Sequence, residues 1–256
     1  MRVFRYIGLN GVPAFGIAHG NEAFATIGSP FTDMQCGDSL GQLSTIALLA
    51  PVQPGKIICV AMNYIKHVLE REPWREMPKE PSLFLKPPSA VIGPGEFIQI
   101  PFIDHPTHHE AELVAVIGRT ARSVLPQESL EYVFGYTCGN DVTDEVLHDV
   151  YGQGIRAKSY ETFCPIGPWI ETDLDTSTLN IYSRTNGELR QSGSTSEMLF
   201  DLPTIISFIS SIMTLNPGDM IMTGTPAGIS AMSAGDIVEI GIEGIGVLSN
   251  PVRICA

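Results

Sequence analysis

The pattern of apolar and polar positions predicts a chain built mainly from short strands. Six apolar stretches of strand length are separated by turn-forming segments rich in the chain's 25 glycines and 19 prolines. They are residues 3–7, 14–18, 56–60, 113–117, 237–242 and the segment around Ile221. We therefore expect a β-rich α+β fold.

The clearest predicted helix covers residues 203–215. Asp201 is placed to cap it, Pro203 suits its first turn, and the sequence Asn-Pro-Gly at 216–218 ends it. Apolar residues cover most of the circumference of this helix. We expect it to be buried.

Two regions are expected along the chain. The proline-rich and glycine-containing segment 51–55 separates a β-rich start from a strand that opens the main region. We place a small N-terminal lobe at residues 1–54 and a catalytic domain at residues 55–256. Internal repeats and low-complexity runs are not evident.

Composition and charge narrow the class of protein. A chain of 256 residues with 44% hydrophobic and 17% charged residues can bury a large core. Its formal charge of −13 disfavours nucleic acid and membrane surfaces as partners. A small anionic substrate remains compatible, because a bound cation and one or two lysines can create a local positive site.

The cysteines and the N-terminus favour a cytoplasmic protein. Five cysteines are scattered without a Cys-x-x-Cys pair, so we expect reduced thiols. The first residues lack the apolar stretch of a signal peptide, and no segment approaches the length of a membrane span.

Two glutamates enter an apolar strand. Strand alternation places Glu110 and Glu112 on one face, about 7 Å apart, and this face continues with Val114 and Val116. Unpaired buried carboxylates cost several kcal/mol, roughly, so a bound cation explains them economically. The alternative is a solvated entrance to the strand.

Asp141 offers a third carboxylate at the end of another apolar stretch. Three carboxylates would form an all-oxygen site suited to Mg²⁺ or Mn²⁺, with Ca²⁺ also possible. Alternatively, Asp141 is an ordinary turn residue. His108 alternates with Glu110 and could instead give a mixed site preferring iron or zinc. His19, His105 and His109 are expected on the surface or in loops.

A short helix is expected to start at Asn63, as a capping residue, and to stop before Pro73. His67 and Glu70 would share one face of it. A carboxylate beside an imidazole fixes the tautomer and stabilises the protonated form, as a general base requires. The alternative is an ordinary surface pair.

Three further residues are candidates for binding or balancing negative charge. Lys158 could offset the three acidic ligands and stabilise an enolate. Thr225 and nearby amides such as that of Gly224 could hold a substrate carboxylate. A solvated lysine and a simple turn are the alternatives.

Taken together and in their order, these motifs resemble the fumarylacetoacetate hydrolase family from about residue 55 to 252. The motifs are Asn63-Tyr64-x-x-His67-x-x-Glu70, Phe84-Leu85-Lys86-Pro87, Glu110-x-Glu112, Asn140-Asp141-Val142-Thr143, Lys158-Ser159 and Thr223-Gly224-Thr225-Pro226. Residues 109–114, 214–221 and 243–246 are most similar to the bifunctional isomerase/decarboxylase of homoprotocatechuate (4-hydroxyphenylacetate) degradation.

The resemblance implies a mixed β-roll and a homodimer. It also implies a metal-dependent isomerase/decarboxylase for 2-oxo or 2-hydroxy-enol dicarboxylates, such as 2-hydroxyhepta-2,4-diene-1,7-dioate and 5-oxopent-3-ene-1,2,5-tricarboxylate. Relatives that hydrolyse acylpyruvates or fumarylacetoacetate, or decarboxylate oxaloacetate, share these motifs. In this interpretation His67, oriented by Glu70, moves protons, and Lys158 assists electrostatically.

One departure from the family affects substrate binding. Many relatives place an Arg-Asp pair after the motif at 140–143, whereas this chain continues with residues Asp144, Glu145 and Val146. Lys86 and Arg156 are the candidates to supply the missing positive charge. The departure favours one rival hypothesis, a catalytically silent carboxylate-binding protein, which the retained His67 and Glu70 disfavour. A third hypothesis is a histidine-dependent iron oxygenase that uses His108.

Overall fold

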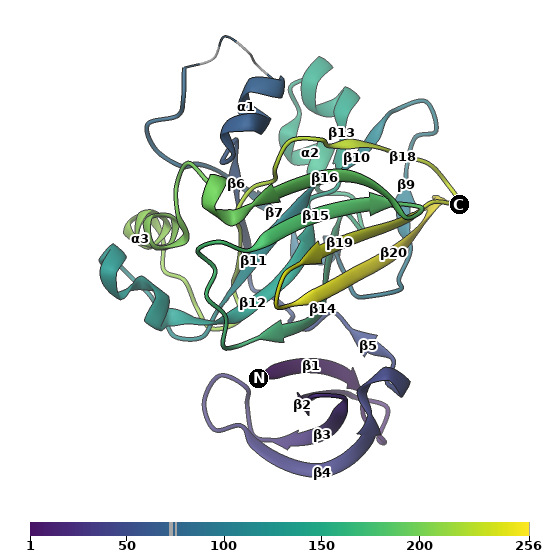
Figure 1. Ribbon diagram of the computed structural model, residues 1–256, viewed down its shortest axis with the longest axis vertical. Coiled ribbons are helices and arrows are strands. Elements are labelled where there is room, and N and C mark those ends of the chain that lie inside the picture. Colours follow the sequence, from purple (N-terminus) through teal and green to yellow (C-terminus); the bar gives the residue numbers. More distant parts are fainter. Residues whose placement is uncertain (72–73, 75, 256) are drawn as a thin grey trace.

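The computed structural model describes residues 1–71, 74 and 76–255. Strands dominate these ranges (Figure 1), and three α-helices accompany them: α1 (Ile65–Arg71), α2 (Gly154–Lys158) and α3 (Leu202–Ile212). The β-rich α+β prediction is confirmed. Pro73, where the sequence predicts the end of the first helix, lies outside the described residues. No helix in the described ranges is long and apolar enough to cross a membrane.

The largest sheet contains twelve strands and runs in the order β4-β3-β2-β1-β14-β12-β11-β17-β6-β7, with β5 paired to β1 and β8 to β14. Its strands are β1 (Arg2–Ile7), β2 (Pro13–His19), β3 (Glu22–Ile27), β4 (Gln35–Gln42), β5 (Leu48–Leu49), β6 (Ile57–Ala61), β7 (Ser82–Lys86), β8 (Val91–Ile92), β11 (Ala111–Ile117), β12 (Val133–Asn140), β14 (Cys164–Glu171) and β17 (Met220–Met222). Strands β11 and β12 pair antiparallel near its middle.

Two smaller sheets complete the fold. One has the order β16 (Glu188–Ser194), β15 (Asn180–Thr185), β19 (Ile237–Ile242), β20 (Gly246–Ile254) and β9 (Ile98–Ile100). The other has the order β13 (Thr143–Asp144), β10 (Thr107–His109) and β18 (Ser230–Met232). The five-stranded sheet packs across β11 and β12 (Figure 1).

Strand β11 is buried on both faces, which explains its continuous apolar character. Leu113 and Ala115 face the main core, shared with the five-stranded sheet and α3. Val114 and Val116 face a second core inside the curved large sheet. Because side chains alternate along a strand, Glu112 points to the same side as Val114. A carboxylate is thereby directed into the interior.

The N-terminal strands β1 to β4 lie together at one end of the molecule (Figure 1). The predicted strands at 3–7 and 14–18 are confirmed within β1 and β2. Strand β1 also pairs with β14, with Val3 opposite Ile170, so hydrogen bonds join this end to the remainder of the large sheet. The boundary between residues 54 and 55 stays a prediction.

Helix α3 confirms its predicted cap, because the Thr204 N–H donates to Asp201 Oδ1 at 3.0 Å. The helix ends at Ile212, three residues earlier than predicted, since Met213 has an extended backbone. The expectation that the whole helix is buried is wrong. One face packs into the main core, while Ile212 is 52% exposed on the other.

Candidate active site

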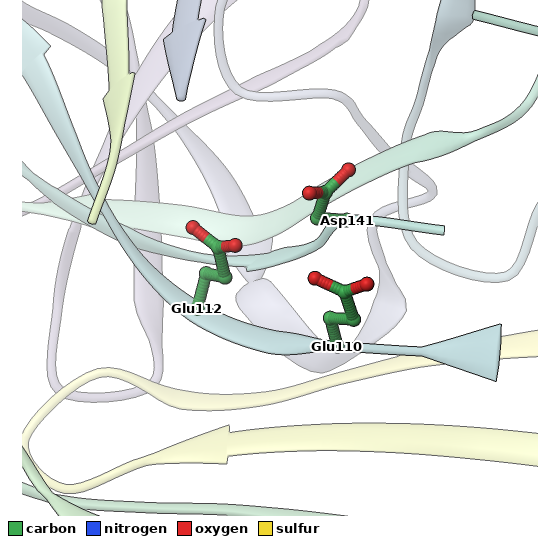
Figure 2. A group of neighbouring side chains, drawn as sticks. All are labelled: Glu110, Glu112 and Asp141. Atoms are coloured by element: carbon green, nitrogen blue, oxygen red, sulfur yellow. The ribbon is translucent and has the colours of Figure 1, made fainter. Parts of the chain in front are cut away.

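Pairing of β11 with β12 brings three carboxylates together. Glu110 immediately precedes β11, Glu112 lies within it, and Asp141 follows β12, whose residue Asn140 is opposite Ala111. Figure 2 shows the two glutamates projecting from the same side of one strand, with Asp141 beside them. Their ligand oxygens lie within 4.8 Å of one another. The exposed fractions are 8%, 2% and 1%, in chain order.

Two lysines contact this group from different elements. Lys158, at the end of α2, places Nζ 2.5 Å from Asp141 Oδ2 and 3.2 Å from Glu110 Oε1. Lys86, at the end of β7, donates to the other oxygen of Asp141 at 2.5 Å and to the Val142 carbonyl at 3.1 Å. Two ammonium groups therefore share one carboxylate.

Three carboxylates and two ammonium groups leave one surplus negative charge. Burial, followed by the charges of Asp141 and Glu110, raises the pKa of Glu112 well above its usual range. Burial also opposes ionisation of Asp141, but Lys158 and Lys86 outweigh it and lower the pKa of that carboxyl. Glu112 is thus the carboxylate for which the lysines compensate least.

The donor set fits a hard divalent cation. Buried carboxylate oxygens that converge at this spacing are the ligands preferred by Mg²⁺ and Mn²⁺, and a bound cation would offset the burial and the neighbouring charges that raise the pKa of Glu112. His108, the alternative ligand, has its Nδ1 3.2 Å from Glu145 Oε1 instead. In the described part of the chain, the group of side chains placed to hold a metal ion consists of the three carboxylates and does not include this histidine.

The three carboxylates border a cavity of about 400 Å³. Four other predicted site residues also line it: His67, Lys158, Gly224 and Thr225. The lining does not include Glu70, Lys86 or Arg156. Most of the remaining wall is apolar, formed by side chains such as Val60, Leu83, Phe84, Ile155 and Ile229.

Helix α1 holds His67 at the cavity. His67 is 7% exposed, and its Nδ1 lies 3.5 Å from Glu70 Oε2. Glu70 also accepts the Gly228 N–H at 3.1 Å, which ties the helix to the loop after β17. Asn63 does not cap α1 as predicted, because its side chain is buried and bonded to the backbone of Phe200 and Thr223.

The loop after β17 supports the carboxylates directly. The Gly224 N–H donates to Glu112 Oε2 at 2.7 Å. Its backbone has φ +94°, and a Cβ there would lie 2.8 Å from Asn63 Cβ, so this position requires glycine. Thr225 Oγ1 accepts from the buried Gln191 Nε2 at 2.7 Å. Sequence reasoning missed Gln191, since nothing in its local pattern signals this contact.

Sequence reasoning also missed Arg71 and Glu145 as lining residues. Arg71 follows His67 by four positions, so the helical period already places both on one side of α1. The pairing of Arg71 with Glu145, 74 residues further along, has no local signal.

The other charged candidates lie elsewhere. Arg156 is exposed and bonds to Tyr160 Oη and Gln153 Oε1. His109 is fully buried, with its Nε2 2.9 Å from Ser230 Oγ, so its prediction as a surface or loop histidine is wrong. The substrate-binding roles of Lys86 and Arg156 stay predictions.

Comparisons with known proteins agree with this architecture. A 5-carboxymethyl-2-hydroxymuconate delta-isomerase from Mycobacterium smegmatis is 41% identical, and the match covers 100% of both chains with a TM-score of 0.88. A 4-hydroxyphenylacetate degradation bifunctional isomerase/decarboxylase from Salmonella dublin is 42% identical over 77% of this chain and 47% of its own.

A third relative has been solved with ligands. The maleylpyruvate hydrolase from Sphingobium sp. SYK-6, in complex with manganese(II) and pyruvate, is 30% identical, and the match covers 100% of both chains with a TM-score of 0.83. Residues 56–253 match the model of the fumarylacetoacetate (FAA) hydrolase C-terminal family. The chain therefore belongs to the fumarylacetoacetate hydrolase family and has its mixed, sheet-rich fold.

Proposed function

We propose that this protein is a divalent-metal-dependent enzyme acting on a 2-oxo or 2-hydroxy-enol carboxylate. The observation that carries the proposal is the buried group of Glu110, Glu112 and Asp141, whose negative charge two lysines do not fully balance. With a divalent cation bound, three ionised carboxylates and two ammonium groups give a local sum of +1. The site then attracts a small anion.

A bound Mg²⁺ or Mn²⁺ would be held by the three carboxylates and would polarise the 2-oxo carboxylate. Lys158 contributes a second positive charge, since its Nζ contacts two of the three ligands. This ammonium stabilises most when negative charge develops on the substrate enolate. Its position on the cavity wall supports this role.

His67 is assigned to proton transfer. Because Nδ1 lies closest to Glu70, Nε2 is the nitrogen assigned to exchange a proton with the substrate or with water. The apolar wall excludes water from much of the cavity and strengthens these electrostatic effects. A proton returned to carbon gives isomerisation or completes decarboxylation, whereas activated water gives C–C hydrolysis.

The relatives support this range of reactions. They include an isomerase, a bifunctional isomerase/decarboxylase and a hydrolase solved with manganese and pyruvate. Isomerisation or decarboxylation is our first assignment, with hydrolysis of an acylpyruvate or fumarylacetoacetate, or decarboxylation of oxaloacetate, as the alternatives. A cytoplasmic homodimer stays a prediction.

A panel assay tests the proposal. Metal-free protein reloaded with Mg²⁺ or Mn²⁺ is incubated with 2-oxo acids and acylpyruvates while CO₂ and enol absorbance are followed. We expect turnover with metal and none with chelator. Binding of 2-oxo acids without turnover of any substrate would support the catalytically silent alternative, and turnover by fully metal-free protein would reject the metal requirement.

A further inference from the structure

A second group of charges borders the same cavity. Arg71 from α1 reaches toward Glu145, and both line the cavity. Arg71 Nη1 donates to Glu145 Oε2 at 2.7 Å. Its Nη2 donates to Asp149 Oδ1 and Oδ2 at 2.8 and 2.9 Å. One guanidinium thus bonds to two carboxylates.

The second group carries no surplus positive charge. With neutral histidines, Arg71, Glu145 and Asp149 sum to −1. Burial opposes ionisation of Glu145, but His108 and Arg71 outweigh it and lower the pKa of this carboxyl to about 2. Burial alone would lower the pKa of Arg71, but Glu145 and Asp149 outweigh burial, so the pKa of this guanidinium is raised. Arg71 and Glu145 are therefore both charged at neutral pH.

This arrangement determines what a second anionic group of the substrate would meet. The proposed function gives the first carboxylate to the cation and Lys158. Among the described lining residues, Arg71 is the other side chain with a permanent positive charge, and it is already engaged. A second carboxylate would therefore compete with Glu145 and be repelled by it.

Most of the remaining wall is apolar, although His148, whose Nδ1 lies 2.7 Å from Asp149 Oδ1, also lines it. Val60, Leu83, Phe84, Ile155 and Ile229 contribute apolar surface. Pockets of this kind bind mainly through apolar contact, with few polar groups fixing orientation. A neutral substrate tail buries this surface without losing the hydration of a charge.

We infer that the cavity selects 2-oxo acids whose remaining part is uncharged, and that Glu145 sets this selectivity by engaging Arg71 and repelling a second carboxylate. The inference rests on the proposed function and narrows it: a substrate with one carboxylate leaves isomerisation or acylpyruvate hydrolysis, and excludes decarboxylation and the hydrolysis of fumarylacetoacetate. It replaces the dicarboxylate expected from the family resemblance with a monoanionic substrate. The departure from the Arg-Asp pair is the cause, because the chain places Glu145 in this segment and supplies its arginine from α1.

Two probes that share the 2-oxo carboxylate but differ in charge at C5 test this selectivity. Isothermal titration calorimetry on Mn²⁺-loaded protein compares 2-oxoglutarate, a dianion, with its 5-methyl ester, a monoanion. We expect the diacid to bind at least tenfold more weakly. Glu145→Gln frees Arg71 from one carboxylate. In this variant the ratio of the dissociation constant of the diacid to that of the monoanionic probe should fall at least fivefold. Asp149→Asn, at a half-exposed carboxylate, should shift it in the same direction even if Glu145→Gln fails to fold.

Glu131→Gln is the matched control, because Glu131 is an exposed carboxylate outside the cavity; it should leave the ratio unchanged. If the unmodified protein binds the diacid as tightly as the monoanionic probe, or more tightly, the inference is wrong while the proposed function stands. An unchanged ratio in folded Glu145→Gln overturns the role of Glu145. If Mn²⁺-loaded protein binds neither probe nor pyruvate, the proposed function fails and the inference fails with it.

Discussion

Lys86 Nζ lies 2.5 Å from Asp141 Oδ1, while Lys158 contacts the other oxygen of the same carboxylate. The two lysines differ in their relation to the cavity. Lys158 lines it, whereas the side chain of Lys86 is fully buried behind Asp141 and also bonds to the Val142 carbonyl. Lys86 is therefore placed to stabilise the folded site, and Lys158 to act on its contents.

Replacing Lys86 tests this division. Lys86→Met leaves Asp141 buried with one fewer partner, so we expect a loss of about 3–5 kcal/mol in the free energy of unfolding, measured by urea denaturation. Lys66→Met removes an exposed ion pair with Glu197 and should cost about 0–1 kcal/mol. Normal stability with a raised KM would instead support the substrate-binding role predicted from sequence.

Lys158→Met should separate stability from catalysis. The metal-free variant loses the ammonium that contacts Asp141, Glu110 and Thr143, so its melting temperature should fall. Added Mn²⁺ should recover most of that loss, but kcat should remain roughly 10²–10³-fold low, because charge developing in the transition state is no longer stabilised. Melting curves and steady-state kinetics measure the two effects. Unchanged kcat in a folded, metal-bound variant would assign Lys158 a purely structural role.

Glu112 should make the metal-free protein sensitive to rising pH. Its pKa is raised in the folded state, so the protonated side chain stabilises the fold below its unfolded pKa. This contribution is lost as pH rises through the folded-state pKa. In chelator, the melting temperature should therefore decline more steeply with pH for the native protein than for Glu112→Gln. Parallel curves would contradict the raised pKa.

His67 and Glu70 should behave as one kinetic unit. The 3.5 Å separation allows the carboxylate to orient the imidazole, so loss of either side chain damages the same proton transfer. We expect His67→Ala to lower kcat by about 10²-fold or more, and the double variant to resemble it. A double-mutant cycle in kcat/KM measures the coupling. Two effects that multiply independently would reject the dyad.

The carboxylate group could be predicted because its signal is local. Glu110 and Glu112 interrupt an apolar strand on one face, and burial of both confirms that the strand carries them inward. Their juxtaposition with Asp141 depended on pairing between β11 and β12, which the family resemblance supplied. Strand periodicity alone does not select a partner strand.

Other features depend on contacts between distant segments. The helix pattern predicted the start of α3 through Asp201, but Met213 is extended and Leu215 pairs with the distant Ala121, so the helix ends early. Asn63 has the chemistry of a cap, yet the buried carbonyls of Phe200 and Thr223 compete successfully for its amide. The Arg71–Glu145 pair likewise depends on how α1 packs over the cavity.

Metal binding to Glu112→Gln tests the central claim most directly. Elemental analysis and calorimetry with Mn²⁺ compare it with native protein and with Glu131→Gln, which removes an exposed carboxylate outside the cavity. We predict about one Mn²⁺ per chain for native protein and the Glu131 variant, and at least 100-fold weaker binding for folded Glu112→Gln, with turnover lost in parallel. Native-like Mn²⁺ affinity in Glu112→Gln would contradict the three-carboxylate metal centre.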